Sequence, residues 1–161
     1  MTSYQAPLAE INFVLNDLVG LGKVSSLPGF EETTPDLVGP ILDEAAKLGE
    51  EVLAPINRSG DIQGCTLENG VVRTPVGFKD AYQQFIDGGW NGLSFDPEYG
   101  GQGLPWLVST AVQEIWHAAN MAFMLCPILT GGAVELLSTH GSGALKSKYL
   151  EKMIVGTWTG S

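Results

Sequence analysis

Residues 95–120 read FDPEYGGQGLPWLVSTAVQEIWHAAN, a glycine-rich loop followed by an apolar pattern that decides the fold. Glycine adopts positive φ angles without strain, so its density here indicates a loop that reverses direction and brings backbone segments close together. We expect at least one of Gly100, Gly101 and Gly103 to have a positive φ. After Pro105 the apolar residues recur at helical spacing, which predicts a core helix over residues 107–119. Its buried stripe is Leu107, Val108, Ala111, Val112, Ile115, Trp116 and Ala119.

Similar apolar spacing predicts helices over residues 11–21, 34–53, 78–88, 121–138 and 145–154. The start of the second is marked by Thr34, whose hydroxyl is expected to cap the helix, with Pro35 at the first helical position. Glycine and proline residues are expected to end or interrupt several of these helices. Gly20 and Gly22 end the first helix before a loop over residues 23–33, Pro55 bends or ends the second, and Pro127 with Gly131-Gly132 interrupts the helix at 121–138.

The segment 57–76 breaks the helical pattern. Asn69-Gly70 accepts the positive φ angles of a type I′ turn, which predicts a small hairpin over residues 66–72. Residues 155–161 have the pattern of a turn followed by the first residues of a strand, although a strand needs ladder partners. The sequence therefore predicts an all-α domain of five or six helices with one small β-hairpin, in a chain that stops in mid-pattern.

Composition excludes several classes of protein. With 161 residues, 44% of them hydrophobic, the chain has enough apolar surface to form a core and is not disordered. A formal net charge of −10 argues against a partner rich in phosphate, whether nucleic acid or an anionic membrane surface. The sequence has no uninterrupted apolar run of about 18 residues, so we predict no membrane span. Without a secretory signal we expect a cytoplasmic protein whose two cysteines, Cys65 and Cys126, are reduced packing residues.

The common catalytic and nucleotide motifs do not occur. Gly101-Gln102-Gly103 lacks the third glycine and the preceding strand of a dinucleotide fingerprint, and Gly141-Ser142-Gly143 lacks the spacing of a nucleophile elbow. His117 and His140 have no neighbours at metal-ligand spacing, so we expect no metal site. Glu114 is interpreted as part of a solvated helix face.

The glycine-rich loop in front of a helix closely resembles that of the acyl-CoA dehydrogenase family. The likeness continues, in the family's order, through Gly88-Gly89-Trp90, Asn120-Met121-Ala122-Phe123 and residues 148–153, which lead to Gly156-Thr157-Trp158. It covers about residues 35–161. The start, with Tyr4–Leu8 and Ile11–Leu15, resembles the N-terminal extension of a long subgroup that includes the 3-methylmercaptopropionyl-CoA dehydrogenases.

This resemblance implies an N-terminal extension at 1–34, the family's N-terminal helical domain at 35–156, and the start of a truncated flavin-binding β domain at 157–161. It implies that the full-length protein oxidises an acyl-CoA to a trans-2-enoyl-CoA with FAD. The family's catalytic Glu and flavin-binding segment have no counterpart here. We therefore expect no catalytic, cofactor-binding or metal residue in this chain, no bound FAD, and no activity of the chain alone.

The resemblance also implies that one wall of the acyl pocket lies near residues 120–125, with Met121, Phe123, Met124 and Leu125 as its side chains. Simple core packing is the alternative role for these four. The acyl chain stays open between a short sulfur-containing group, such as 3-methylmercaptopropionyl, and a plain fatty acyl group. The family further implies an electron-transfer partner and a homo-oligomer. A non-enzymatic, acidic helical module that binds a partner protein through its low-charge face is the alternative function.

Overall fold

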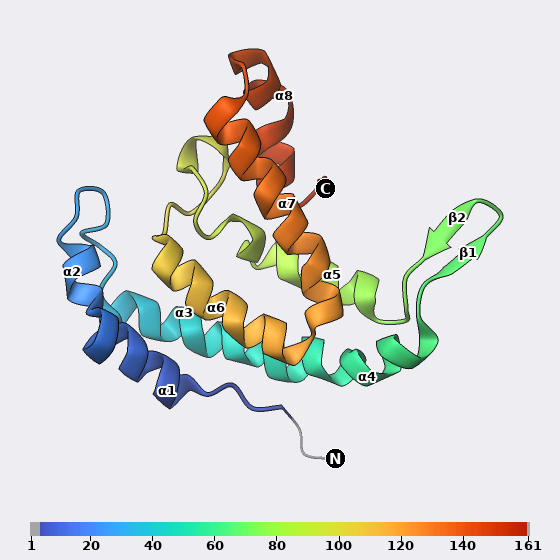
Figure 1. The fold of residues 1–161 in the computed structure, drawn as a ribbon, viewed down its shortest axis with the longest axis horizontal. Helices are drawn as coiled ribbons and strands as arrows, with labels where there is room; N and C mark the ends of the chain where they lie inside the picture. The colour runs from blue at the N-terminus through green and yellow to red at the C-terminus, as the bar shows by residue number, and fades with distance from the viewer. Residues whose placement is uncertain (1–3, 161) are drawn as a thin grey trace.

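The structure, a computed structural model, describes residues 4–160 (Figure 1). The α- and π-helical residues form seven continuous runs within this range, one more than the largest number predicted, and two short 3-10 helices, Trp90–Gly92 and Pro97–Tyr99, lie in the loop between the fourth and fifth runs. The only strands among the described residues are the two of one antiparallel hairpin. The predicted all-α class with a single small hairpin is therefore confirmed.

The first run consists of α1 (Leu8–Phe13) and a π-helical segment (Val14–Val19), and it ends at Gly20, whose φ is +81°. A further short helix, α2 (Leu21–Ser25), follows directly. The prediction that Gly22 ends a helix is wrong, because of these two glycines only Gly20 adopts the left-handed conformation that terminates helices. The predicted loop therefore begins at residue 26 rather than 23. The segment before α1 is tied to the core, since the Tyr4 hydroxyl donates to the Ile115 carbonyl at 2.9 Å.

The longest run joins α3 (Pro35–Lys47), a π-helical segment (Leu48–Leu53) and α4 (Ala54–Gln63). Pro35 opens it as predicted, but the hydroxyl of Thr34 makes no capping hydrogen bond, so that prediction is wrong. Pro55 does not end the run. The Ala54 N–H donates to the Gly49 carbonyl in a π-type bond, and this wider turn lets the helix pass a residue that has no N–H of its own.

The hairpin pairs β1 (Thr66–Glu68) with β2 (Val71–Arg73). Asn69 and Gly70 have φ angles of +51° and +79°, so the predicted type I′ turn is confirmed. All strand residues are exposed, and the hairpin projects from the helical body at the right of Figure 1.

Four more helices complete the fold: α5 (Phe78–Asp87), α6 (Trp106–Ala119), α7 (Met121–His140) and α8 (Gly143–Ile154). The predicted interruption at Pro127 and Gly131-Gly132 is wrong, because α7 is continuous through all three. Packing against α6 and α8 offsets their poor helix propensity. Residues 157–160 contain a bend and no strand, while Ser161 lies outside the described residues. The domain boundaries inferred from the sequence stay predictions.

The predicted core helix is confirmed as α6, which lies against α3 and α7 (Figure 1). Val108, Val112 and Ile115 are completely buried, and Trp116 donates its indole N–H to the Ala45 carbonyl at 2.9 Å. Glu114 is exposed, as expected for the solvated side of an amphipathic helix.

Asn120 forms the corner between α6 and α7 and is completely buried. Its Nδ2 donates to the Leu53 carbonyl at 3.1 Å, and its Oδ1 accepts the Phe123 N–H at 3.0 Å as the N-cap of α7. One amide therefore joins the longest helical run to both helices of the corner.

We predict that Asn120→Ala lowers the free energy of unfolding by about 2 kcal/mol, since it removes a cap and leaves a buried carbonyl without its donor. Urea denaturation followed by circular dichroism measures this difference. Asn120→Asp is the matched comparison, because it keeps the cap oxygen but has no amide donor for Leu53. An Asn120→Ala variant as stable as the parent would show that the corner does not depend on this side chain.

The apolar character of α7 exceeds what the described fold buries. Its most apolar 18 residues have a mean hydropathy of 1.6, and 28% of them are buried. By length and composition alone this helix meets the criterion for a membrane span, so the expectation of no span stays a prediction. The helix also packs on α6 and α8, as core helices of soluble proteins do. Its exposed apolar side chains are Met121, Leu125, Ile128, Leu129 and Leu136.

Candidate functional site

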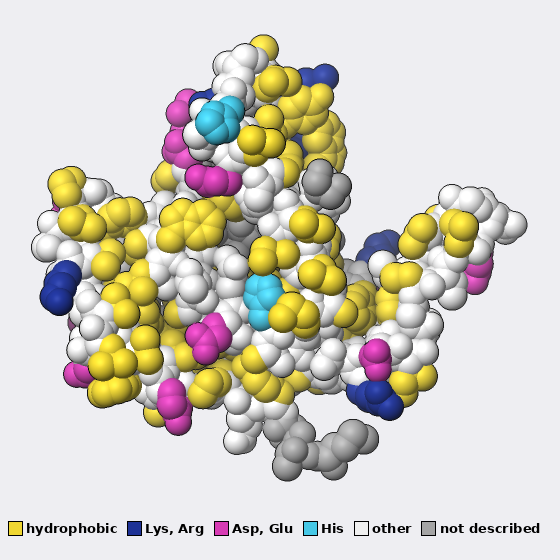
Figure 2. All heavy atoms as spheres, viewed as in Figure 1, with side chains coloured by type: hydrophobic (Ala, Val, Ile, Leu, Met, Phe, Trp, Pro, Cys, Tyr) yellow, Lys and Arg dark blue, Asp and Glu magenta, His cyan; other side chains and the backbone are white. Residues whose placement is uncertain are grey.

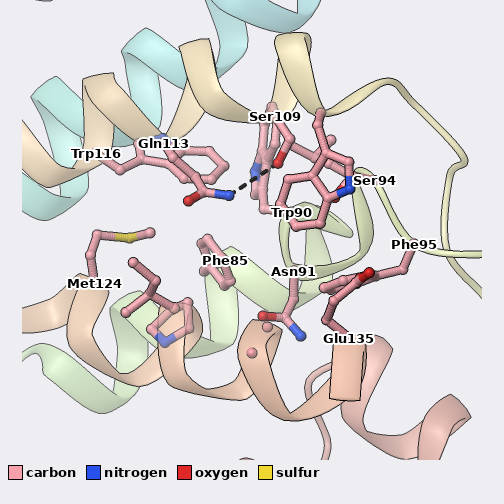
Figure 3. Close-up of a pocket in the computed structure, with 16 residues that line it drawn as sticks. Phe85, Trp90, Asn91, Ser94, Phe95, Ser109, Gln113, Trp116, Met124 and Glu135 are labelled. Carbon is pink, nitrogen blue, oxygen red and sulfur yellow. Dashed lines mark hydrogen bonds between the residues drawn. The ribbon is translucent and has the colours of Figure 1, made fainter. Parts of the chain in front are cut away.

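A cavity of about 360 Å³ lies between α5, α6 and α7 (Figure 3). Phe85 of α5, Trp116 of α6 and Met124 of α7 are almost completely buried and close its inner end. The loop from Trp90 to Pro105 closes the side, and Trp106 and Ile128 lie at the exposed end. The site is therefore a pocket with an aromatic floor and an open mouth.

The glycine-rich loop shapes this pocket. Gly100 and Gly103 have φ angles of +87° and +66°, which confirms the predicted positive φ. The Gln102 N–H donates to the Gly92 carbonyl at 2.9 Å, and the Leu104 N–H donates to the Leu93 carbonyl at 2.8 Å. A Cβ at Gly101 would overlap the backbone of Phe95. The loop thus folds back on its own backbone and holds residues 90–95 against the cavity.

The aromatic floor is rigidly packed. The rings of Phe85 and Trp116 lie edge to face with centroids 5.2 Å apart, and the indoles of Trp90 and Trp116 do the same at 5.1 Å. Such pairs add stability beyond the area they bury, so the rings keep their places. A ligand that reaches this end meets polarisable ring faces and the thioether of Met124.

Few polar groups line the cavity, and most are already committed. Gln113 Nε2 donates to Ser109 Oγ at 3.0 Å, and Asn91 Nδ2 donates to the carbonyls of Met153 and Ile154 at 2.7 and 3.1 Å. Glu135 is exposed at the mouth (Figure 3). The described lining includes no Lys or Arg. This composition suits an uncharged, mainly apolar ligand group.

The four residues predicted for the acyl pocket are divided between two hollows. Met124 lines the cavity, whereas Met121, Phe123 and Leu125 line a wider groove of about 960 Å³ between α4, α5 and the start of α7. Met124 and Phe123 are buried, and Met121 and Leu125 are more than half exposed. Their role in binding an acyl group stays a prediction.

Sequence reasoning did not find Trp90, Gln113 or Ser109 as lining residues. Ser109 and Gln113 are four positions apart on α6, and Trp116 lies three further on, so all three share one side of that helix. This side is adjacent to the apolar stripe that was identified. The polar members could have signalled a pocket next to the core.

The groove contains both cysteines of the chain. Cys65 and Cys126 are free and exposed, so their interpretation as packing residues is wrong. Tyr82 also lines the groove, and burial, with a smaller contribution from Cys126, raises its pKa to about 12. Its hydroxyl donates to the Gly156 carbonyl at 2.8 Å, so this tyrosine has a structural role at neutral pH.

Cys126 is exposed as a residue, but the atoms of the groove around its thiol remove part of the water that would solvate a thiolate, and this desolvation raises the pKa of the thiol above its ordinary value. Because the thiolate is the nucleophile, we predict slow alkylation of Cys126 at neutral pH. In the variant Cys65→Ser, iodoacetamide should alkylate Cys126 more slowly than it alkylates N-acetylcysteine. The rate of Cys126 alkylation should rise at higher pH. Mass spectrometry of quenched samples gives both rates, and the double variant Cys65→Ser/Cys126→Ser, which has no thiol, provides the background. If the alkylation rate of Cys126 reached half its maximum at a pH at or below that found for N-acetylcysteine, this would contradict the raised pKa.

No group of three or more His, Cys, Asp or Glu side chains over residues 4–160 has the arrangement of a metal site. The cavity also lacks a nucleophile with an adjacent base among its described residues. What the arrangement can do is hold the apolar part of a ligand.

Comparison with known proteins gives a consistent result. Residues 40–157 match the N-terminal domain of the acyl-CoA dehydrogenases. The chain is 43% identical over 159 residues to 3-methylmercaptopropionyl-CoA dehydrogenase of Ruegeria pomeroyi, covering 99% of this chain and 27% of that protein. Two butyryl-CoA dehydrogenases of Syntrophomonas wolfei are each 26% identical over 163 residues, with the same coverage. The chain therefore spans about a quarter of the length of these relatives.

Proposed function

The chain belongs to the acyl-CoA dehydrogenase family, and from this premise we propose that it serves an FAD-dependent enzyme that oxidises an acyl-CoA to a trans-2-enoyl-CoA. Residues 40–157 match the family's N-terminal domain, and we propose that the residues before them form an extension of it. In this proposal the cavity between α5, α6 and α7 receives the acyl group, and the CoA nucleotide stays outside.

The cavity is the observation that carries this proposal. Its volume of about 360 Å³ is at the lower end of ligand pockets, which suits a short acyl chain rather than a whole CoA thioester. Its floor of Phe85, Trp90 and Trp116 excludes water from the chain end. No cation among the described lining residues could neutralise the phosphates of CoA.

We propose that the described residues do not form a flavin site by themselves. A flavin dinucleotide needs donors for its pyrophosphate, and the described lining of the cavity includes no Lys or Arg that could supply a cationic one. When bound in such an enzyme, FAD accepts the hydride from the substrate. We propose that the residues that hold FAD and remove the α proton belong to other parts of the enzyme, and that this domain positions the acyl chain.

The names of the relatives suggest the substrates to test. One is a 3-methylmercaptopropionyl-CoA dehydrogenase and two are butyryl-CoA dehydrogenases. The acyl groups in these names are all short. The aromatic floor beside Met124 would also contact a thioether favourably. We propose a short acyl-CoA as the substrate, with the sulfur-containing group as the first candidate.

The protein that carries this chain should be assayed with an artificial electron acceptor against 3-methylmercaptopropionyl-CoA, butyryl-CoA and palmitoyl-CoA. We expect turnover with the two short substrates and at least tenfold lower kcat/KM with palmitoyl-CoA. The 161-residue chain alone serves as the control and should show no turnover. Absence of turnover with every acyl-CoA would contradict the proposed function.

A non-enzymatic interaction module is the second candidate, because α7 exposes a run of apolar side chains. Exposed apolar patches of this kind mark surfaces that another protein or domain covers. Figure 2 shows hydrophobic side chains over much of one face of the molecule. The turnover assay distinguishes the two candidates, since a binding module without catalysis would leave every acyl-CoA unchanged.

A further inference from the structure

One wall of the cavity is a single face of α7. The residues of this face lie three, four, seven, eight and eleven positions after Met124, which is the spacing of residues on one side of a helix. They are Met124, Pro127, Ile128, Gly131, Gly132 and Glu135. Proline and glycine have the poorest helix propensities, and every proline and glycine of α7 lies on this face.

Packing within the described chain does not explain the two glycines. A Cβ at Gly131 would meet Phe95 Cζ at 3.7 Å, an ordinary contact, and a Cβ at Gly132 would meet nothing within 4 Å. Neither glycine has a positive φ. Gly101 is different, because a Cβ there would overlap backbone atoms. Alanine would therefore fit at both positions of α7 and would favour the helix.

The glycine pair does affect one feature of the structure, which is the width of the cavity. The indole of Trp90 also lines the cavity (Figure 3), as does that of Trp106, which is half exposed. Side chains at 131 and 132 would project into the space that these rings face. The pair keeps the α7 backbone open to an occupant of the cavity.

We propose that Gly131 and Gly132 are specificity-determining residues of the cavity: they let an acyl chain lie against the α7 backbone, with its end toward Met124 and Trp116. This inference rests on the proposed function, which assigns the acyl group to this cavity. Gly132 is the more informative position, because a Cβ there meets no atom of the described chain within 4 Å, whereas a Cβ at Gly131 meets Phe95.

Stability and binding should then change in opposite directions. Gly132→Ala replaces a helix-interior glycine with the best helix former, and its melting temperature should rise by about 2 °C or more. Gly132→Leu also suits a helix, but its larger side chain fills the mouth. We expect it to weaken binding of a short acyl thioester at least tenfold without lowering the melting temperature.

The test uses the 161-residue chain and the butyryl thioester of N-acetylcysteamine, which carries the acyl group without the nucleotide. Tryptophan fluorescence reports occupancy, because Trp90, Trp106 and Trp116 line the cavity and Trp158 does not. Dissociation constants are compared for the parent, Gly132→Leu and Gly22→Ala. Gly22 is also a helical glycine with nothing within 4 Å, but it lies in α2, so its replacement should leave binding unchanged.

The outcomes separate the two claims. A parent that binds the thioester and a Gly132→Leu variant that binds at least tenfold more weakly, with an undiminished melting temperature, support the inference. If the parent and Gly132→Leu bind the thioester equally well, the proposed role of Gly132 is wrong, but the cavity can still be the acyl site. A parent that does not bind the thioester contradicts the acyl site and the inference together. If Gly132→Leu does not fold, a lower melting temperature for Gly132→Ala overturns the inference, because the glycine would then be required by the fold.

Discussion

Replacement of Gly101 by alanine should lower the free energy of unfolding by about 4 kcal/mol or more, the range reserved for steric conflict at a special backbone position. A Cβ at this position would overlap the carbonyl group of Phe95, and backbone atoms cannot move aside as a flexible side chain can. Relief of the overlap would displace the Gly101 and Gly103 N–H groups, which donate to the carbonyls of Asp96 and Phe95.

The measurement is urea denaturation of Gly101→Ala beside the parent. Gly143→Ala is the matched control, since a Cβ at Gly143 meets nothing within 4 Å and should change the stability little. Because domains of this size are stable by only about 5–15 kcal/mol, Gly101→Ala should be partly unfolded or strongly destabilised at 25 °C. A loss below about 1 kcal/mol would show that the loop does not fold back as described.

Ile115→Ala should lower the free energy of unfolding by about 2–5 kcal/mol, because it deletes methyl groups from a completely buried position and leaves a cavity. The site is tightly enclosed. A Cβ at Gly49 would already approach Ile115 Cγ2 at 3.1 Å, so the two helical backbones are in close contact here. The surrounding atoms can fill the space left by the truncated side chain only in part. We therefore expect the loss of unfolding free energy to lie in the upper part of the range given for Ile115→Ala.

A graded series makes this second measurement specific. Ile115→Val should cost about 0.5–1.5 kcal/mol, and Thr110→Ala, on the exposed side of α6, should stay within about 0.5 kcal/mol of the parent. Denaturation midpoints of the three variants should follow this order. Equal midpoints for Ile115→Ala and Thr110→Ala would contradict the central place of α6 in the core.

Features governed by short-range chemistry were predictable from the sequence. Asn69-Gly70 determined the hairpin turn, and the stripe around Ile115 determined the core helix. The positive φ of Gly100 and Gly103 followed from the crowding of glycines in one loop. In each case residues within a few positions of one another supply the physical cause.

Features that depend on distant partners were not predictable. The π-helical segment before Pro55 lets the helix continue, and nothing in the local pattern specifies it. Likewise α7 passes through Pro127 and Gly131-Gly132 because α6 and α8 support it. The cavity joins α5, the loop after it, α6 and α7, so the sequence indicated Met124 but not Trp90 or Gln113. Only the fold shows that Met121 and Leu125 face a different hollow.

We propose that the cavity between α5, α6 and α7 holds the acyl chain. This proposal is tested most directly by photo-crosslinking of the protein that carries this chain with a short acyl-CoA bearing a diazirine at the end of its acyl group. Peptide mass spectrometry then locates the adduct. We expect adducts on Met124, Gln113 or Trp116 that unlabelled 3-methylmercaptopropionyl-CoA or butyryl-CoA suppresses. Suppressible adducts on Met121, Leu125 or Cys126 instead, or none within these 161 residues, would contradict it.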